Sequence, residues 1–273
     1  MICALTALIA AFPLATGQKP ASAIAPTRNP IVLGDSVTLR WYITGTKVVL
    51  SGGKFGKGIV VTGKTSAVDS PRRATKYTLE SWYQNPADSK RLLHAKYAAV
   101  VDVLDPQPLG LQTYRDSRGW RLLHPKEWKR DKVDLPDPVN NALLYFQEEE
   151  DSLERLAVAV LPVKEQSAAA LMKRVEADLP SRYDDAEVIS RQDISFEEVP
   201  AILTVVSGKD TTHSGARTQS VILAFVHAGR GYVISARTAA ARFSSRQPLL
   251  MKLVKSFAFL PATPPRSTVS GSR

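Results

Sequence analysis

The sequence is poor in the side chains that most often act as nucleophiles or metal ligands. Its single cysteine, Cys3, lies in an apolar N-terminal run, so a mature chain that begins beyond this run has neither a disulfide nor a thiol nucleophile. Such a chain is compatible with oxidising and reducing compartments alike. The histidines are isolated and lack the spacing of metal ligands: His94, His124, His213 and His227. We therefore expect no metal site, and no motif indicates a cofactor.

The N-terminal run has the features of an export leader. Residues 1–25 combine an apolar stretch with Ala21-Ser22-Ala23, a small-residue site that signal peptidase accepts, although a positively charged start is missing. Pro13 and the short length argue against a membrane-spanning helix. Because Cys3 does not follow the apolar run, we expect no lipoprotein anchor. The alternative is a cytosolic protein with a disordered start.

The formal net charge of +10 is unevenly distributed. Residues 28–104 contain twelve lysines and arginines but five acidic residues, whereas residues 105–273 contain 23 basic and 21 acidic ones. A basic N-terminal part favours an anionic surface such as lipid headgroups, an envelope polymer or nucleic acid. Because no nucleic-acid motif accompanies the charge, we expect no nucleic acid partner. A surface that is simply cationic is the alternative.

Residues 26–105 carry the pattern of a small all-β module. Val37, Leu39 and Trp41 alternate with polar residues, which indicates a half-buried strand. Similar β-rich runs recur between turns that contain glycine, serine or proline, at residues 47–50, 58–61, 76–83 and 95–104. No helical period of useful length separates them, so the segment predicts a β-sandwich.

Two stretches of this module resemble the immunoglobulin-like domains of bacterial extracytoplasmic proteins. In those domains a Gly-Asp/Glu-Ser turn leads into a strand that bears tryptophan, as GDSVTLRWYITGTK does here. A later Pro-x-x-x-Thr-x-Tyr-x-Leu segment, here Pro71 to Leu79, forms the sixth strand. The resemblance covers residues 26–105 and implies an all-β immunoglobulin-like sandwich without the cysteine pair of antibody domains.

A second module is expected at residues 112–260, after the proline-bearing linker 106–111. Ser167 resembles an N-cap for a helix over residues 168–179, whose apolar residues recur at three- and four-residue steps. A second helix is expected at residues 245–257. Strands are expected at 119–124, 142–146, 153–163, 186–196, 201–209, 218–228 and 231–239. This order predicts an α+β antiparallel sheet with helices on its faces, followed by a disordered tail at residues 261–273.

The order of motifs in this module resembles the PsbP/DcrB/Mog1-like α/β/α superfamily. The resemblance begins at Gly119-Trp120-Arg121-Leu122-Leu123-His124-Pro125 with Trp128, continues through the LAVAVLPV strand, and closes at Leu253-Val254-Lys255-Ser256-Phe257. Members include extrinsic photosystem II subunits, bacterial envelope lipoproteins, a Ran-binding factor and secretion-system chaperones. The resemblance therefore implies a binding module without a common catalytic centre, and it transfers the fold but not the role.

Three motifs imitate catalytic or ion-binding sites. Residues 58–65 satisfy the phosphate-loop pattern G-x-x-x-x-G-K-[ST], but no helical pattern follows them. Gly34-Asp35-Ser36-Val37 imitates the nucleophile block of GDSL-type ester hydrolases, with His213 as the downstream base, but Ser36 begins an alternating strand. The acidic residues 148–151 and Glu154 lack the spacing of a calcium loop. We expect turns and solvated loops at all three.

These observations predict a non-catalytic exported binding or scaffold protein of the periplasm, the cell envelope or the medium. The expected partner is a protein or an anionic envelope component, and the charge is compatible with peripheral membrane association. The surface proposed to bind it contains Arg115, Arg118, Arg121, Lys126, Trp128, Lys129 and Arg130. The alternatives are a photosystem-associated factor of the thylakoid lumen, if the source is photosynthetic, and a hydrolase that uses Ser36 and His213.

Overall fold

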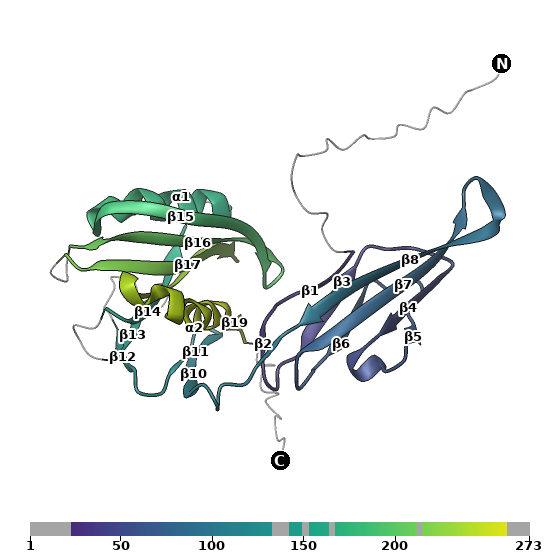
Figure 1. The fold of residues 1–273 in the computed structure, drawn as a ribbon, viewed down its shortest axis with the longest axis horizontal. Coiled ribbons are helices and arrows are strands. Elements are labelled where there is room, and N and C mark those ends of the chain that lie inside the picture. Colours follow the sequence, from purple (N-terminus) through teal and green to yellow (C-terminus); the bar gives the residue numbers. More distant parts are fainter. Residues whose placement is uncertain (1–22, 133–141, 149–152, 164–166, 212–214, 261–273) are drawn as a thin grey trace, which may run out of the picture.

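A computed structural model describes residues 23–132, 142–148, 153–163, 167–211 and 215–260. Most of the expected leader, the whole tail, three of the acidic residues (149–151) and His213 lie outside these ranges. The chain forms two modules that lie side by side (Figure 1). Within the described ranges, no helix has both the length and the apolar character needed to cross a membrane.

The N-terminal module is built from two sheets that share one core. One sheet has the order β1-β3-β6 and the other β5-β4-β7-β8. The strands are β1 (Ile24–Pro26), β3 (Val37–Trp41), β6 (Ser66–Asp69), β4 (Lys47–Ser51), β5 (Ile59–Val60), β7 (Thr75–Asn85) and β8 (Asp88–Val101), and η1 (Gly53–Phe55) is a short 3-10 helix. The inward residues of the expected strand, Val37, Leu39 and Trp41, are buried here with Leu50 and Leu79, so the alternation is confirmed. The first strand begins two residues before the expected start of the module at residue 26.

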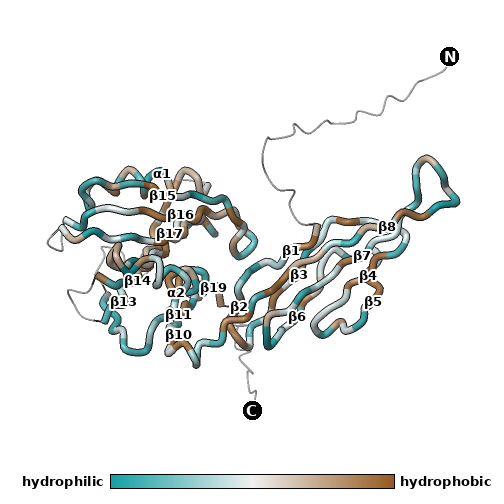
Figure 2. Tube along the Cα trace, viewed as in Figure 1, coloured by the Kyte–Doolittle hydropathy of each residue, from teal (hydrophilic) through white to brown (hydrophobic). Residues whose placement is uncertain are grey.

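A short parallel pair connects this module to the second one. Strand β2 (Ile31–Val32) pairs with β9 (Val103–Leu104). Val32 and Leu104 pack into the core of the second module, whereas Ile31 belongs to the core of the first. Figure 2 shows hydrophobic residues at β2, where the two modules meet. The modules are therefore joined by apolar packing as well as by the covalent chain.

The second module is an antiparallel sheet of seven strands with helices on both faces (Figure 1). The sheet order is β12-β13-β14-β18-β17-β16-β15. Its strands are β12 (Lys129–Lys132), β13 (Ala142–Gln147), β14 (Arg155–Pro162), β15 (Tyr183–Phe196), β16 (Val199–Asp210), β17 (Arg217–His227) and β18 (Arg230–Ala239). A smaller sheet covers one face together with α2 (Phe243–Lys255). Its strands are β10 (Leu111–Asp116), β11 (Trp120–Pro125) and β19 (Ala258–Phe259), and the 3-10 helix η3 (Ala240–Arg242) leads into α2. The other face is covered by α1 (Ala168–Asp178) and the 3-10 helix η2 (Leu179–Ser181).

Local signals placed most of these elements correctly. Ser167 caps α1 by accepting a hydrogen bond from the backbone N–H of Ala170 at 3.2 Å, as the sequence predicts. The residues of β17 from Val221 to Phe225 are buried on both faces, because α1 and α2 cover opposite sides of this central strand. Strands β10, β12 and β19 were not expected. Strand β12 lies in a charged segment between the expected strands 119–124 and 142–146, and its pairing with β13 is set by the sheet and not by its own pattern.

Candidate functional site

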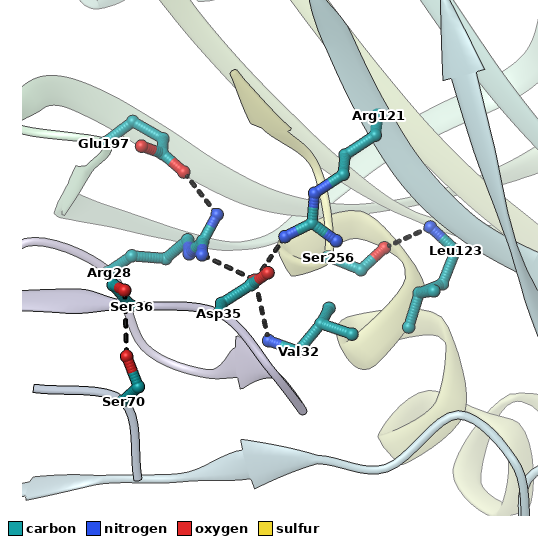
Figure 3. A network of polar contacts seen from close by, with 9 residues as sticks. All are labelled: Arg28, Val32, Asp35, Ser36, Ser70, Arg121, Leu123, Glu197 and Ser256. Carbon is teal, nitrogen blue, oxygen red and sulfur yellow. Dashed lines mark hydrogen bonds and ion pairs between the residues drawn. The ribbon is translucent and has the colours of Figure 1, made fainter. Parts of the chain in front are cut away.

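Asp35, from the apparent hydrolase motif, lies at the joint between the modules. Its carboxylate accepts hydrogen bonds from the backbone N–H of Val32 at 3.2 Å, from Arg28 Nη2 at 2.7 Å, and from Arg121 Nη2 (Figure 3). The side chains of Arg28 and Arg121 are only 11% and 9% exposed. One carboxylate thus binds a guanidinium from each module in a largely water-excluded place, which makes the pairing stronger than a surface ion pair.

The turn between β15 and β16 extends this joint. Glu197 and Glu198 both have positive φ angles, 50° and 68°, which form a tight hairpin turn. Arg28 Nη1 donates to Glu197 at 2.9 Å, and Arg40 donates to Glu198 at 2.7 Å in a more exposed pair. Burial raises the pKa of the Glu197 carboxyl, while Arg28 opposes the shift. The second module therefore contacts the first through two separate segments.

The surroundings of Ser36 do not support the hydrolase alternative. Its hydroxyl is within hydrogen-bonding distance of the Ser70 hydroxyl, at 2.8 Å, in an exposed position (Figure 3). Strand β3 follows at Val37, so no helix N-terminus adjoins the serine. The neighbouring Asp35 already accepts hydrogen bonds from Arg28 and Arg121 at the joint.

The apparent phosphate loop and Glu154, from the acidic motif, also belong to ordinary strands, turns and ion pairs. Residues 58–65 contain β5 and a turn, and lead into β6 instead of a helix, so they form no phosphate loop. Trp41 Nε1 donates to the carbonyl of Lys64 at 2.8 Å. Glu154 forms ion pairs with Arg242 at 3.0 Å and Arg246 at 3.4 Å. Among the described residues, no group of side chains has the arrangement of a metal site.

The structure divides the proposed partner-binding residues into two groups. Arg121 and Trp128 are buried, the former at the joint, and Arg118 is held by Asp116. The others are exposed, and we refer to them as the cationic strip: Arg115, Lys126, Lys129 and Arg130. None of these four forms an ion pair with an acidic residue in the described ranges. The sequence could not separate the groups, because burial depends on the contact of Arg121 with the first module and on the packing of Trp128 in the core of the second.

A polar cluster lies beside the strip. Arg118 binds Asp116 through Nε at 2.6 Å and Nη2 at 2.8 Å, and the Tyr114 hydroxyl donates to Asp116 at 3.1 Å. Burial raises the pKa of Asp116, but the bonds from Arg118 outweigh it, so the net shift is downward. The Arg130 guanidinium lies 5.5 Å from the centre of the Tyr114 ring. Arg130 is therefore positioned by contacts with β10, whereas Lys126 and Lys129 lack such support in the described contacts.

We expect His124 to make the stability of the second module depend on pH. It is buried against Phe146, and its Nδ1 donates to the carbonyl of Pro125 at 2.8 Å. Burial lowers the pKa of His124 below its usual value of 6.5. The unfolded chain then binds more protons than the native one between these two pKa values, so stability falls as the pH drops below about 6.5.

We expect the urea midpoint of His124→Gln to lack this acid-dependent loss between about pH 7.5 and pH 5.5. The matched variant His94→Gln, on an exposed strand position beside Glu80, should retain it. An NMR titration of His124 with a pKa at or above 6.5 would contradict the expectation.

A hollow of about 370 Å³ lies on the face of the large sheet that α1 covers. Its floor consists of residues from β13, β14, β17 and β18, and α1 with η2 forms one wall. One end is rich in arginine, including Arg155 and Arg237. No pattern in the sequence predicts this groove, because its two floor arginines are 82 positions apart and meet only through the pairing of β14 with β18.

Several known proteins are similar to the second module. No curated protein matches the chain. Among solved structures, the cyanobacterial PsbP protein CyanoP of Synechocystis is 18% identical, with 55% of this chain and 92% of that one covered and a TM-score of 0.42. The Ran-binding protein Mog1p of Saccharomyces cerevisiae is 12% identical, with 55% and 95% covered and a TM-score of 0.39. LpqN of Mycobacterium tuberculosis, involved in cell envelope biogenesis, is 9% identical, with 57% and 95% covered and a TM-score of 0.37.

The family model of PsbP matches residues 109–259, which is just over half of the chain. This range starts within the expected linker, two residues before β10, and ends at β19, so it coincides with the second module. The chain belongs to the PsbP family.

Proposed function

We propose that this protein is a non-catalytic, exported binding protein of the cell envelope. In this proposal an immunoglobulin-like N-terminal module holds the PsbP-family module in a fixed orientation toward a protein or anionic envelope partner. The observation that carries it is the joint, where Asp35 binds Arg28 and Arg121 beside the apolar contacts of Val32 and Leu104. A joint with both packing and buried charge pairing restricts rotation between modules more than a flexible linker does.

The architecture of the first module supports an immunoglobulin-like assignment. Its two sheets enclose a single core, and the tryptophan of the resemblance, Trp41, is fully buried in it on β3. Tyr77 and Leu79, from the second motif, lie in the same core on β7. Both stretches that suggested the resemblance thus contribute core residues from opposite sheets.

The start of β1 supports removal of the leader after Ala23. Ile24 is the first residue of β1 and is fully buried in the sandwich, where it pairs with Trp41. Cleavage after Ala23 would leave the whole strand in the mature protein, whereas cleavage two residues later would remove most of it. The proposed processing site and the first residue of β1 are therefore adjacent.

The cationic strip is the surface that we propose meets the partner. Arg115 and Arg130 come from β10 and β12, and Lys126 follows β11, so the exposed cations come from three segments between residues 115 and 130. Exposed cations of this kind mainly raise the rate of association with an acidic surface and make binding sensitive to salt.

The test compares two charge-reversal variants of the full chain. One carries glutamate at the four positions of the cationic strip, and the control carries glutamate at four exposed cations of the first module, Lys57, Lys64, Arg73 and Lys76. After expression in the native host and chemical cross-linking in intact cells, we expect the strip variant to lose the partners of the wild type by about tenfold or more, with the control little changed. Equal recovery by both variants, or wild-type protein found only in the cytosol, would refute the proposal.

A further inference from the structure

The groove on the α1 face exists because one short helix covers a wide sheet. Helix α1 packs on β16 and β17, where Leu171 and Met172 share a core with Ile202 and Ile222. On β14 and β18 the same face bears small residues that are only half-buried: Ala157, Ala159, Val233 and Ser235. The helix therefore covers one side of this face, whereas the described residues leave the other side open.

Strand pairing arranges the floor in rows. Ala157 lies opposite Ser235 and Ala159 opposite Val233, so two adjacent rows are small and largely apolar. Leu143 and Tyr145 continue these rows on β13, where they lie opposite Ala159 and Ala157. The floor thus offers an apolar track that runs along the strands beside α1.

The next row of the same face is cationic. Arg155 of β14 lies directly opposite Arg237 of β18, an arrangement in which like charges repel. Arg237 Nη1 donates to Asp210 at 2.6 Å, and Arg155 Nε donates to the amide oxygen of Gln147 at 2.8 Å. In the described part of the chain, no carboxylate lies within ion-pair distance of Arg155.

The Arg237 guanidinium also has an unused edge. Its Nε and Nη2 atoms are buried and have no hydrogen-bond partner among the described residues. This edge is the two-donor fork that matches the two oxygens of a carboxylate. A buried donor without a partner is costly, so rotation of the guanidinium onto an anion in the adjoining groove would remove that cost.

The net charge of the residues that line the groove also favours an anion. Besides Arg155 and Arg237, the mouth of the groove carries Arg174 and Arg182, against the two carboxylates of Asp178 and Asp210. The lining therefore has two more formal positive charges than negative ones. An anion is favoured at this end, and an apolar chain along the track.

We propose that the groove binds a medium-chain carboxylate, with its head group held by Arg155 and Arg237 and its chain lying over Ala157, Ala159 and Val233. The volume of about 370 Å³ is near the lower limit of ordinary ligand sites, which suits a chain of moderate length. A free inorganic anion would leave the apolar track empty, and a peptide would bring backbone polar groups that the apolar rows cannot satisfy. This site is on the opposite face of the sheet from α2 and is independent of the cationic strip.

The first test is direct binding of decanoate to the purified full chain, after removal of copurified lipid, by isothermal titration calorimetry. We expect decanoate to bind, decyltrimethylammonium to bind about tenfold more weakly or not at all, and inorganic phosphate to compete poorly. Equal binding of the anionic and cationic amphiphiles would show that the arginines do not select the ligand and would overturn the proposal. So would phosphate that binds as tightly as decanoate, or decanoate that does not bind.

The second test uses variants within the groove. Arg155→Gln and Arg237→Gln should each weaken decanoate binding by about tenfold, since each removes charge-assisted hydrogen bonds to the head group. Arg246→Gln, at an exposed arginine of α2 on the other face, should leave it unchanged. Because Arg237→Gln also removes the partner of Asp210 and could impair folding, Ala159→Phe serves as a second variant that fills the half-open track. Unchanged decanoate binding in Ala159→Phe would place the ligand elsewhere and overturn the proposal.

Discussion

Replacement of Asp35 by alanine is expected to destabilise the protein by about 3 kcal/mol, because it leaves two buried guanidinium groups without their shared carboxylate. Arg28 would keep its bond to Glu197, but Arg121 has no other ion pair with a described residue. The loss should appear as a lower urea midpoint for unfolding monitored by circular dichroism. We also expect the two modules to become mutually mobile, which small-angle X-ray scattering would detect as a larger radius of gyration.

Glu198→Ala is the matched control, since it removes a carboxylate that also connects the two modules. Its pair with Arg40 is exposed, with side chains 44% and 50% accessible, so its loss should cost no more than about 1 kcal/mol. If both variants had the same small effect, the Asp35 cluster would not hold the modules together. The proposed presentation of the PsbP-family module by the sandwich would then lose its main support.

Trp120→Ala should be the most destabilising single change in the second module, at about 3–5 kcal/mol. The side chain is fully buried and stacks on Phe257 at 5.4 Å, with Tyr114 at 5.6 Å on another side. It connects β11 to the residues that follow α2, so its removal opens a cavity between the small sheet and the helix. Urea unfolding measured by far-ultraviolet circular dichroism would give the change in free energy.

Two further variants separate the loss of ring packing from the loss of the Nε1 donor and from the effect of an exposed substitution. Trp120→Phe should cost about 1–2 kcal/mol less than the alanine variant, because most of the ring packing is kept and a buried Nε1 donor without a described partner is removed. Tyr42→Ala, at a side chain 88% exposed, should change stability by less than about 0.5 kcal/mol. A small effect of Trp120→Ala would mean that β11 is not anchored to α2 as described.

Periodic patterns predicted much of the fold because they report local geometry. The alternation at Val37, Leu39 and Trp41 indicated a strand with one buried face, and Ser167 indicated the start of a helix. Their positions are confirmed. Strands β10 and β12 escaped prediction because exposed polar residues interrupt their alternation, and they are held in place by pairing with β11 and β13.

The candidate sites were harder to predict than the strands. The motif at Asp35 and Ser36 suggested a hydrolase, which its surroundings do not support, and the contact of Asp35 with Arg121 joins residues 86 positions apart. Arg121 was expected on an exposed binding surface, but the structure places it in the buried joint. The charge of these residues can be read from the sequence, but their burial and their partners cannot.

Local sequence was enough to indicate two modules, both α-helices, many of the strands, and the resemblance of the second module to the PsbP family, since these depend on patterns within short stretches. The joint at Asp35 and the facing arginines of the groove depend on which distant strands pair and in what register. Shared burial among many residues selects that pairing, so no short segment contains it. The groove that we propose as a binding site therefore becomes visible only when the complete chain is folded.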